Sequence, residues 1–221
     1  MITQEFRGQK FEFVETKTAP QLVQEIFADN YKVFQKEIKF RDGDVILDIG
    51  ANEGFFSIMI AKLFPMTRVI AIEPIPKTVV TLRENILLNK TFNVEAMPYA
   101  VGMPGMDSIK FIVSKDYSGG STSKCTFNPE HHYEVSVTAF SLNQIFDLCF
   151  IDRCRLMKMD IEGAEYEVLY PSSVLEKTDY FTGELHTNNR LEYEGRRMVG
   201  LASWISNRTK CIHIEPCNMA E

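Results

Sequence analysis

The sequence lacks the features of a membrane-spanning, secreted or nucleic-acid-binding protein. No apolar stretch approaches the ~20 residues that a transmembrane helix needs. The first residues, MITQEFRGQKFEF, do not form the apolar core of a signal peptide. Lys and Arg number 24 against 30 Asp and Glu, so the net charge is -6 and no basic excess is left for binding phosphates. These absences predict a cytoplasmic protein that neither spans a membrane nor binds nucleic acid.

The cysteines also lack the spacing of a metal or redox motif. The chain has five, at positions 125, 149, 154, 211 and 217, and no two of them have the C-x-x-C spacing. His213 lies between the last two, but buried thiols on an alternating strand explain that pattern better than metal ligands do. Scattered free thiols are typical of the reducing cytosol.

What the chain does contain is a repeated alternation of strands and helices. Its 221 residues, 45% apolar and 24% charged, suit one folded domain over residues 1–221. Short apolar runs alternate with helical patterns, which predicts an α/β fold with a Rossmann-like, doubly wound and mostly parallel sheet. The strands are predicted at 45–49, 68–74, 93–101, 155–163, 179–186 and 210–216, and the helices at 54–64, 77–90, 141–150, 164–170 and 191–206.

Two segments depart from this alternation. The N-terminal segment, residues 1–40, combines an exposed strand at 10–15 with a helix that Pro20 opens. Residues 103–140 contain two strand patterns and are predicted to form a strand–loop–strand insertion, a β-hairpin. The loop of this insertion is long and rich in Gly, Ser and Thr. Long loops inside compact domains are often functional, and a variable surface excursion is the alternative.

Polar or flexible residues end most of the predicted strands. In an open parallel sheet, ligands bind beyond the carboxyl ends of the strands, where the strand order reverses. A sheet stabilised by packing alone has no need of carboxylates and glycines at that edge. The candidate cofactor-binding residues are Asp48, Gly50, Asn52, Gly54, Glu73, Pro74, Tyr99 and Ala100, and the later strands add Asp160, Glu162, Glu184 and His186.

The first of these turns, D-x-G-x-x-x-G, indicates the type of cofactor. It is not the G-x-G-x-x-G turn that places a pyrophosphate on a helix N-terminus. A carboxylate before the turn, Asp48, favours a cofactor with a positively charged head over one with two phosphates. Glu73 ends the second strand, where an acidic side chain can accept hydrogen bonds from the ribose hydroxyls of a nucleoside. Nicotinamide cofactors and S-adenosylmethionine share that requirement.

Several motifs resemble the FkbM-type family of S-adenosylmethionine-dependent methyltransferases. They are DIGANEGFFSIMIAK at 48–62, AIEPIP at 71–76, NILLNK at 85–90, AVG at 100–102, GELH at 183–186 and, above all, LMKMDIEGAEYEVL at 156–169. The last is similar to the family signature K-x-D-x-E-G-x-E, at Lys158, Asp160, Glu162, Gly163 and Glu165. The resemblance covers residues 42–186.

The resemblance implies a class I methyltransferase fold with S-adenosylmethionine bound in the turn after the first strand. It also implies O-methyl transfer, often to sugars or natural products, so the expected partner is a small-molecule or glycan acceptor. A lipid, polyketide or peptide acceptor is the alternative, as is a non-catalytic protein that binds S-adenosylmethionine. A nicotinamide-dependent oxidoreductase fits neither the turn nor the second motif. The chain departs from the family at Glu53, where an apolar residue is usual, and this carboxylate is expected to add charge near the cofactor.

Methyl transfer to an alcohol requires a base, or a cation that stabilises the alkoxide. His186 is the first candidate for the base because imidazole titrates near neutral pH, and Asp160 and Glu162 are the other catalytic candidates. Asp160, Glu184 and His186 could instead form a site for Mg²⁺ or Mn²⁺. Lys158 shares a strand face with Asp160 and is predicted to pair with it. The oligomeric state does not follow from the sequence.

Overall fold

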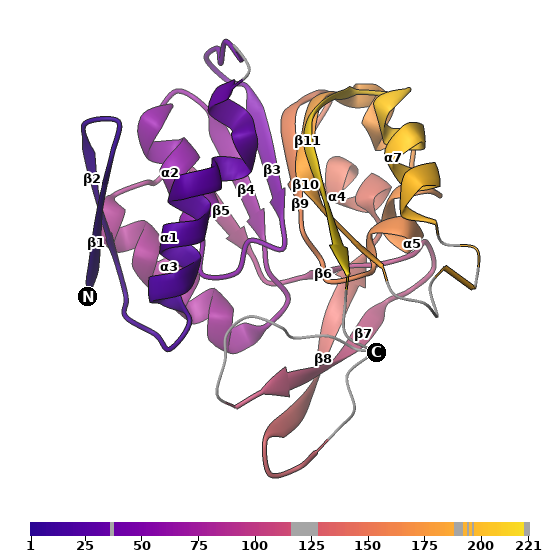
Figure 1. The fold of residues 1–221 in the computed structure, drawn as a ribbon, viewed down its shortest axis with the longest axis horizontal. Coiled ribbons are helices and arrows are strands. Elements are labelled where there is room, and N and C mark those ends of the chain that lie inside the picture. Colours follow the sequence, from indigo (N-terminus) through magenta and orange to yellow (C-terminus); the bar gives the residue numbers. More distant parts are fainter. Residues whose placement is uncertain (36–37, 116–127, 188–191, 194, 196, 219–221) are drawn as a thin grey trace.

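The computed structural model describes residues 1–35, 38–115, 128–187, 192–193, 195 and 197–218. Its central sheet contains β3 (Val45–Ile49), β4 (Arg68–Ile72), β5 (Val94–Met97), β9 (Cys154–Met159), β10 (Thr178–Thr187) and β11 (Lys210–Asn218). Among the described residues the strand order is β11-β10-β9-β3-β4-β5, and every adjacent pair is parallel (Figure 1). The order reverses beside β3, so the predicted doubly wound α/β fold is confirmed.

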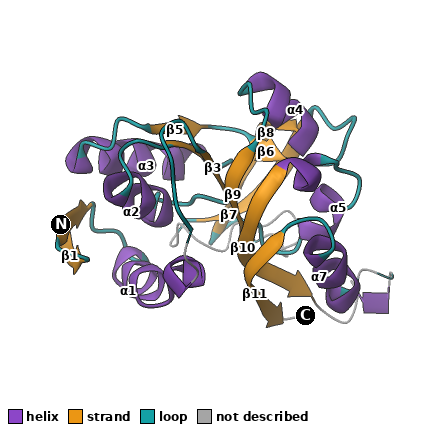
Figure 2. Ribbon diagram, turned by 90° about the horizontal axis from the view of Figure 1, so that it is seen from above, coloured by secondary structure: helices purple, strands orange, loops and turns teal. Residues whose placement is uncertain are grey.

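Helices cover both faces of this sheet (Figure 2). One side carries α1 (Ala19–Asp29), α2 (Phe55–Leu63) and α3 (Pro76–Asn89), and the other carries α4 (Leu142–Leu148), α5 (Glu165–Leu169) and α7 (Met198–Ser206). Two short 3-10 helices are η1 (Asn30–Gln35) and η2 (Val174–Lys177). Alternate residues of β3 enter separate cores, Ile46 on one side and Leu47 and Ile49 on the other. Burial on both faces explains why this strand is almost entirely apolar.

The strand predicted at 93–101 is divided in two. β5 ends at Met97, since the following Pro98 has no N–H to donate to a ladder. β6 (Ala100–Val101) then pairs with β8 (His132–Phe140), which also pairs antiparallel with β7 (Ser108–Ser114). The β7–β8 hairpin lies below the carboxyl ends of the central strands (Figure 1). Most of the loop predicted within this insertion, residues 116–127, falls outside the described residues.

The N-terminal segment begins with a separate hairpin of β1 (Ile2–Phe6) and β2 (Gln9–Phe13). The exposure predicted for this strand is wrong, because Phe11 and Phe13 are fully buried. Their rings pack on Phe27 of α1, with centroids 5.0 and 6.0 Å away. This aromatic cluster fixes α1 against the rest of the fold. In the described part of the chain, no helix is long and apolar enough to cross a bilayer.

Candidate active site

A cavity of about 570 Å³ opens where β3, β4, β9 and β10 end. Residues that follow β3 and β4 line one part of it, and residues that follow β9, together with Glu184 within β10, line another. The predicted ligand-binding ends of these strands therefore face a single space. α1 and the segment that includes β7 add an apolar wall, made of Leu22, Ile26, Met103, Met106, Ile109 and Phe111.

Glu73 is held at the end of β4 by two backbone amides. The N–H of Asn52 donates to Oε2 at 3.0 Å, and the N–H of Ile75 donates to Oε1 at 2.9 Å. Burial raises the pKa of this carboxyl to about 7, even though the two amides favour its charged form. Each carboxylate oxygen can accept a further hydrogen bond, and Glu73 lines the cavity. The side chain therefore suits the ribose hydroxyls of a nucleoside.

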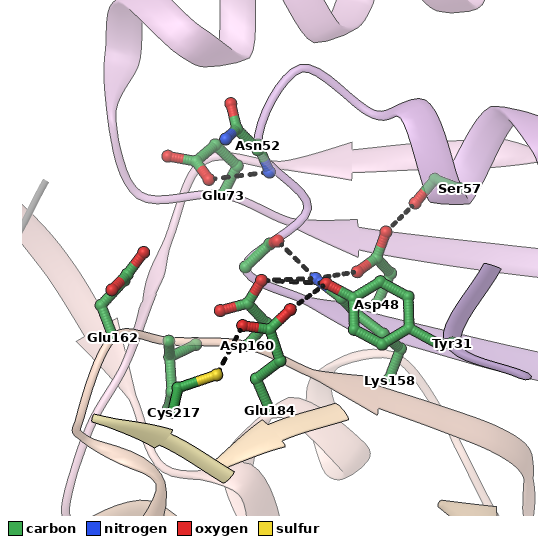
Figure 3. Close-up of polar contacts among 12 residues, drawn as sticks. Tyr31, Asp48, Asn52, Ser57, Glu73, Lys158, Asp160, Glu162, Glu184 and Cys217 are labelled. Carbon is green, nitrogen blue, oxygen red and sulfur yellow. Dashed lines mark hydrogen bonds and ion pairs between the residues drawn. The ribbon is translucent and has the colours of Figure 1, made fainter. Parts of the chain in front are cut away.

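Asn52 provides a second acceptor beside Glu73 (Figure 3). Its side-chain Oδ1 is buried and has no hydrogen-bond partner among the described residues. An unsatisfied buried oxygen costs free energy, so a ligand that donates a hydrogen bond here would stabilise the site. The hydroxyl and ammonium groups of S-adenosylmethionine are such donors. The predicted cofactor residues Gly50, Asn52, Glu73, Pro74 and Tyr99 all line this cavity and fit that cofactor.

Gly50 allows the turn after β3 to pass very close to the turn after β9. Its φ is 78°, and a Cβ at this position would lie 1.8 Å from the carbonyl oxygen of Asp160. Only glycine combines this left-handed conformation with so close an approach. Gly50 therefore allows the cofactor part of the cavity to lie directly beside the part that contains Asp160.

The structure does not bring three of the predicted cofactor-binding residues to the cavity lining. Asp48 is fully buried on the α2 side of the sheet. Gly54 allows α2 to start close to α3, since a Cβ there would overlap a leucine of that helix. Ala100 is buried in β6. Glu53, expected to add charge near the cofactor, is also buried and accepts a hydrogen bond from Thr16 Oγ1 at 3.1 Å.

Lys158 connects the buried Asp48 to the cavity. The two residues are partners in the parallel pairing of β3 and β9. The Lys158 Nζ lies 3.4 Å from Asp48 Oδ1 and 3.6 Å from Asp160 Oδ2, and it donates to the carbonyl of Gly50 at 2.9 Å. Burial lowers the pKa of Lys158, but the charges of Asp48 and Asp160 outweigh burial and hold that pKa above its usual value. The predicted pairing of Lys158 with Asp160 is confirmed.

Tyr31, in η1, is a cavity residue that the sequence analysis missed. Its hydroxyl lies 3.1 Å from Asp160 Oδ2 and 3.2 Å from Glu184 Oε1 (Figure 3). Burial, followed by the charges of Asp160 and Glu184, raises the pKa of this phenol, so the hydroxyl stays protonated and donates. The backbone of Tyr31 is left-handed, with φ 49°, which is unfavourable for a residue with a side chain. Thr182 Oγ1 donates to the Tyr31 carbonyl at 2.6 Å and helps to hold this conformation.

His186 lies beside the predicted carboxylates but does not line the cavity. Its Nε2 is 3.6 Å from Glu162 and from Glu184, and 4.0 Å from Asp160. Burial lowers the pKa of His186, but the hydrogen bond and charge of Glu165, with the charges of Asp160 and Glu162, outweigh burial and raise the pKa to about 9. A protonated ring outside the cavity does not suit a general base. The base role of His186 therefore stays a prediction, and this geometry favours another role for the ring.

Glu165 organises the turn between β9 and α5. Its side chain is almost fully buried, and Oε1 accepts hydrogen bonds from the N–H groups of Ile161 and Gly163, both at 3.2 Å. The same oxygen lies 2.9 Å from Nδ1 of His186. Glu165 belongs to the signature motif, but no role could be assigned to it from sequence. The structure shows that it fixes the His186 ring.

The predicted metal ligands are divided between two groups of side chains. Within the described residues, ligand atoms of Asp160, Glu162 and His186 lie within 4.8 Å of one another, and so do those of Glu184, His186 and Cys217. The predicted combination of Asp160, Glu184 and His186 is not one of these groups. In the second group, the thiol of Cys217 donates to Glu184 Oε2 at 3.2 Å.

Comparisons with known proteins bear on the identity of this fold and site. Methyltransferase 1 of Beauveria bassiana (strain ARSEF 2860) is 28% identical over 146 residues, which are 59% of this chain and 59% of that protein. The chain therefore matches less than two thirds of the length of that curated relative. Among solved structures, precorrin-6y C5,15-methyltransferase from Geobacter metallireducens GS-15 is 17% identical, with a TM-score of 0.35 over 75% of this chain and 56% of that one. TYW2 of M. jannaschii in complex with AdoMet is 24% identical, with a TM-score of 0.29 over 43% and 41%.

Residues 48–195, more than half of the chain, match the family described as Methyltransferase FkbM domain. The match includes the end of β3 and the turn after it, the Glu73 turn, the signature motif and β10, which together form most of the cavity. The chain belongs to the FkbM family of S-adenosylmethionine-dependent methyltransferases.

Proposed function

We propose that the chain transfers a methyl group to a hydroxyl of a sugar, carried by a glycan or by a glycosylated natural product. The observation behind this proposal is that one cavity extends from Glu73 in its cofactor part to Asp160, Glu162 and Glu184 in the other. S-adenosylmethionine, when bound, supplies an activated methyl group. The protein must then align the acceptor and accept its proton.

We assign the proton-accepting role to Glu184. It lines the cavity, its Oε1 accepts a hydrogen bond from the Tyr31 hydroxyl at 3.2 Å, and its Oε2 accepts one from the Cys217 thiol at 3.2 Å and lies 3.6 Å from Nε2 of His186. Asp160 is engaged instead through its Oδ2, which lies 3.6 Å from the ammonium of Lys158 and 3.1 Å from the Tyr31 hydroxyl. Asp160 and Glu162 remain catalytic residues in this proposal, as acceptors of hydrogen bonds from other hydroxyls of the substrate.

The charge of the cavity supports a neutral acceptor. A strongly negative lining attracts the cationic head of S-adenosylmethionine and repels phosphate groups, whether on an acceptor or on a dinucleotide cofactor. Burial, followed by the charges of Glu184 and Asp160, raises the pKa of Glu25, which reflects this accumulation of charge. Against the single cation of Lys158, the lining carboxylates in the described chain are Glu25, Glu73, Asp160, Glu162, Glu167 and Glu184.

The apolar wall supports a second acceptor class. The wall faces the carboxylates across the same cavity, so it could contact a lipid, a polyketide or the apolar side chains of a peptide. A glycosylated natural product uses both surfaces, because its sugar meets the carboxylates while its apolar aglycone meets the wall. That match is why the glycosylated acceptor stands first in the proposal.

A cytoplasmic location is also part of this proposal. The four described cysteines, Cys149, Cys154, Cys211 and Cys217, are all free. Free thiols suit a reducing compartment.

Calorimetry with S-adenosylmethionine and with NADH tests the cofactor. Only S-adenosylmethionine is expected to bind. The substitution Glu73→Ala should weaken its binding by about 1.5–3 kcal/mol, the contribution of a hydrogen bond to a charged group. Glu134→Ala, on the exposed face of the hairpin, is the control and should bind normally. Unchanged affinity in Glu73→Ala would remove Glu73 from the cofactor site.

A methyl-transfer screen tests the acceptor. Methyl-labelled S-adenosylmethionine is incubated with glycosylated natural products, free glycans and lipids, and labelled products are counted. With the best acceptor, Glu184→Gln should lower turnover by ~10²–10⁴-fold and leave cofactor affinity nearly unchanged. Transfer to lipids alone would contradict the sugar acceptor and favour the second acceptor class, a lipid, polyketide or peptide. Cofactor binding with no transfer to any panel would favour a non-catalytic binding protein.

A further inference from the structure

The two ring nitrogens of His186 have different surroundings. Nδ1 lies 2.9 Å from Glu165 Oε1, and two backbone amides hold that carboxylate in place. A carboxylate that binds one imidazole nitrogen and leaves the other free is the arrangement found behind metal-bound histidines. The His186 side chain is only 7% exposed, and its Nε2 points toward the carboxylates of Asp160 and Glu162.

The spacing around Nε2 is that of ligands around a common ion. Nε2 makes no hydrogen bond to any described residue, and it lies 3.6 Å from Glu162 Oε2 and 4.0 Å from Asp160 Oδ1. A charge-assisted hydrogen bond would bring one of these oxygens to about 2.7–2.9 Å. Ligands that bind one divalent ion at about 2.0–2.2 Å are instead about 3–4 Å apart.

Neighbouring contacts turn the two carboxylates toward this gap. The Tyr31 hydroxyl and the Lys158 ammonium both contact Oδ2 of Asp160, which leaves Oδ1 on the His186 side. Glu162 has a left-handed backbone with φ 55°, an unfavourable conformation for a residue with a side chain. Strained residues of this kind concentrate at functional sites. Here the strained turn places Glu162 Oε2 near Nε2.

The other candidate groups in the described chain are weaker. Asp29, His213 and Glu215 also lie close together, but the ammonium of Lys32 is 3.1 Å from His213 Nδ1 and already supplies a cation there. The group that contains Cys217 shares Nε2 of His186, so only one of the two groups can use it. Cys217 does not line the cavity, whereas Asp160 and Glu162 both do.

We propose that Asp160, Glu162 and His186 bind one divalent ion of the Mn²⁺ type at the cavity wall. Two carboxylate oxygens and one imidazole nitrogen are a donor set suited to such an ion. Three ligands leave coordination positions that face the cavity, where an acceptor hydroxyl could bind and lose its proton more easily. That catalytic use rests on the proposed function, but the binding of the ion does not.

Calorimetric titration of Mn²⁺ into the full chain, after treatment with a chelator, tests the site. Loss of the electron paramagnetic resonance signal of free Mn²⁺ provides a second readout. One ion should bind per chain. Glu162→Gln and His186→Ala should each weaken binding by more than about tenfold, and Glu165→Gln by about 10–100-fold through the His186 ring. His213→Ala and Cys217→Ser are the matched controls and should bind Mn²⁺ normally.

Circular dichroism and the affinity for S-adenosylmethionine show whether each variant is folded. Glu162 is only half-buried, with a side chain that is 45% accessible, so Glu162→Gln is the variant least expected to disturb the fold. A chain that binds S-adenosylmethionine but no Mn²⁺ overturns the metal site and leaves the proposed function intact. A chain that binds Mn²⁺ but no S-adenosylmethionine overturns the proposed function and leaves the metal site intact. Loss of Mn²⁺ binding in His213→Ala or Cys217→Ser, with Glu162→Gln unaffected, overturns the site by placing the ion elsewhere.

Discussion

The phenolic oxygen of Tyr31 lies 3.1 Å from Oδ2 of Asp160, although 129 positions separate the two residues in the chain. Asp160 belongs to the signature motif, whereas Tyr31 lies before residue 48, where the family match begins. A segment outside the matched region therefore completes the part of the cavity that we assign to the acceptor. Differences in this segment are a direct route by which related chains could accept different substrates.

Tyr31→Phe should lower the free energy of unfolding by about 1–3 kcal/mol, because two carboxylates lose their shared donor. Denaturant unfolding measures the change. Tyr180→Phe is the matched control: its ring contacts Arg155, and its hydroxyl makes no hydrogen bond to a described residue. The control should change stability by less than about 0.5 kcal/mol. Equal effects in the two variants would show that the Tyr31 hydroxyl contributes nothing.

The affinity for S-adenosylmethionine should rise with pH and level off above pH 7. Burial raises the pKa of the Glu73 carboxyl to about 7 in the free protein, and hydroxyl donors favour the ionised form, so the bound protein has a lower pKa. Binding therefore releases a proton below pH 7, and affinity at pH 6 should be about tenfold weaker than at pH 8. Calorimetry between pH 6 and pH 8 measures how the affinity for S-adenosylmethionine changes with pH.

Glu73→Gln is the control for that pH dependence. Glutamine has no carboxyl to titrate, so any slope that remains comes from the cofactor itself or from other residues. An identical slope in the wild type and Glu73→Gln would contradict the assignment of Glu73 to the ribose.

The sequence was sufficient to predict the strands and the turns that end them, because a buried parallel strand has a strong local signal. Glu73 and Asp160 follow such strands, and both line the cavity. Tyr31 could not be found this way. The helical pattern of α1 indicates an amphipathic helix, but the position of η1 depends on how α1 packs against Phe11 and Phe13, which are distant in sequence.

The role of a residue also depends less on its type than on its surroundings in the folded chain. Asp48 and Gly50 are two positions apart, yet one is buried on the α2 side of the sheet and the other lines the cavity. Imidazole titrates near neutral pH, which favours His186 as a base, but burial, Glu165 and two further carboxylates together set the pKa of this ring. Those neighbours come from another strand end and could be known only from the fold.

Gly50→Ala should be far more damaging than Gly43→Ala, although both glycines are left-handed. Gly43 has a φ of 79°, and a Cβ added there would meet no atom within 4 Å, so its substitution adds only backbone strain, about 1–2 kcal/mol. Gly50→Ala adds an overlap with the Asp160 carbonyl and should cost about 2–5 kcal/mol. Denaturant unfolding and cofactor calorimetry compare the two. Similar stabilities with full cofactor binding would disprove the close approach of the two turns.

Lys158→Met should destabilise the fold by about 3–5 kcal/mol, because it leaves the carboxylate of Asp48 buried without a cation. Asp48 is fully buried, and its remaining side-chain partner is the Ser57 hydroxyl at 2.6 Å. Lys110→Met is the control: it breaks an exposed pair with Glu134 and should cost no more than about 1 kcal/mol.

The double variant Asp48→Asn with Lys158→Met separates the lost ion pair from lost packing. Asparagine keeps the shape of the aspartate and removes its charge, so the double variant should be more stable than Lys158→Met alone. The two residues are in contact, so their effects on the free energy of unfolding should not add. If the effects do add, the ion pair between Asp48 and Lys158 does not stabilise the fold. The stability lost in Lys158→Met would then come from the packing of Lys158 against the ring of Tyr31, whose centroid is 5.1 Å from Nζ.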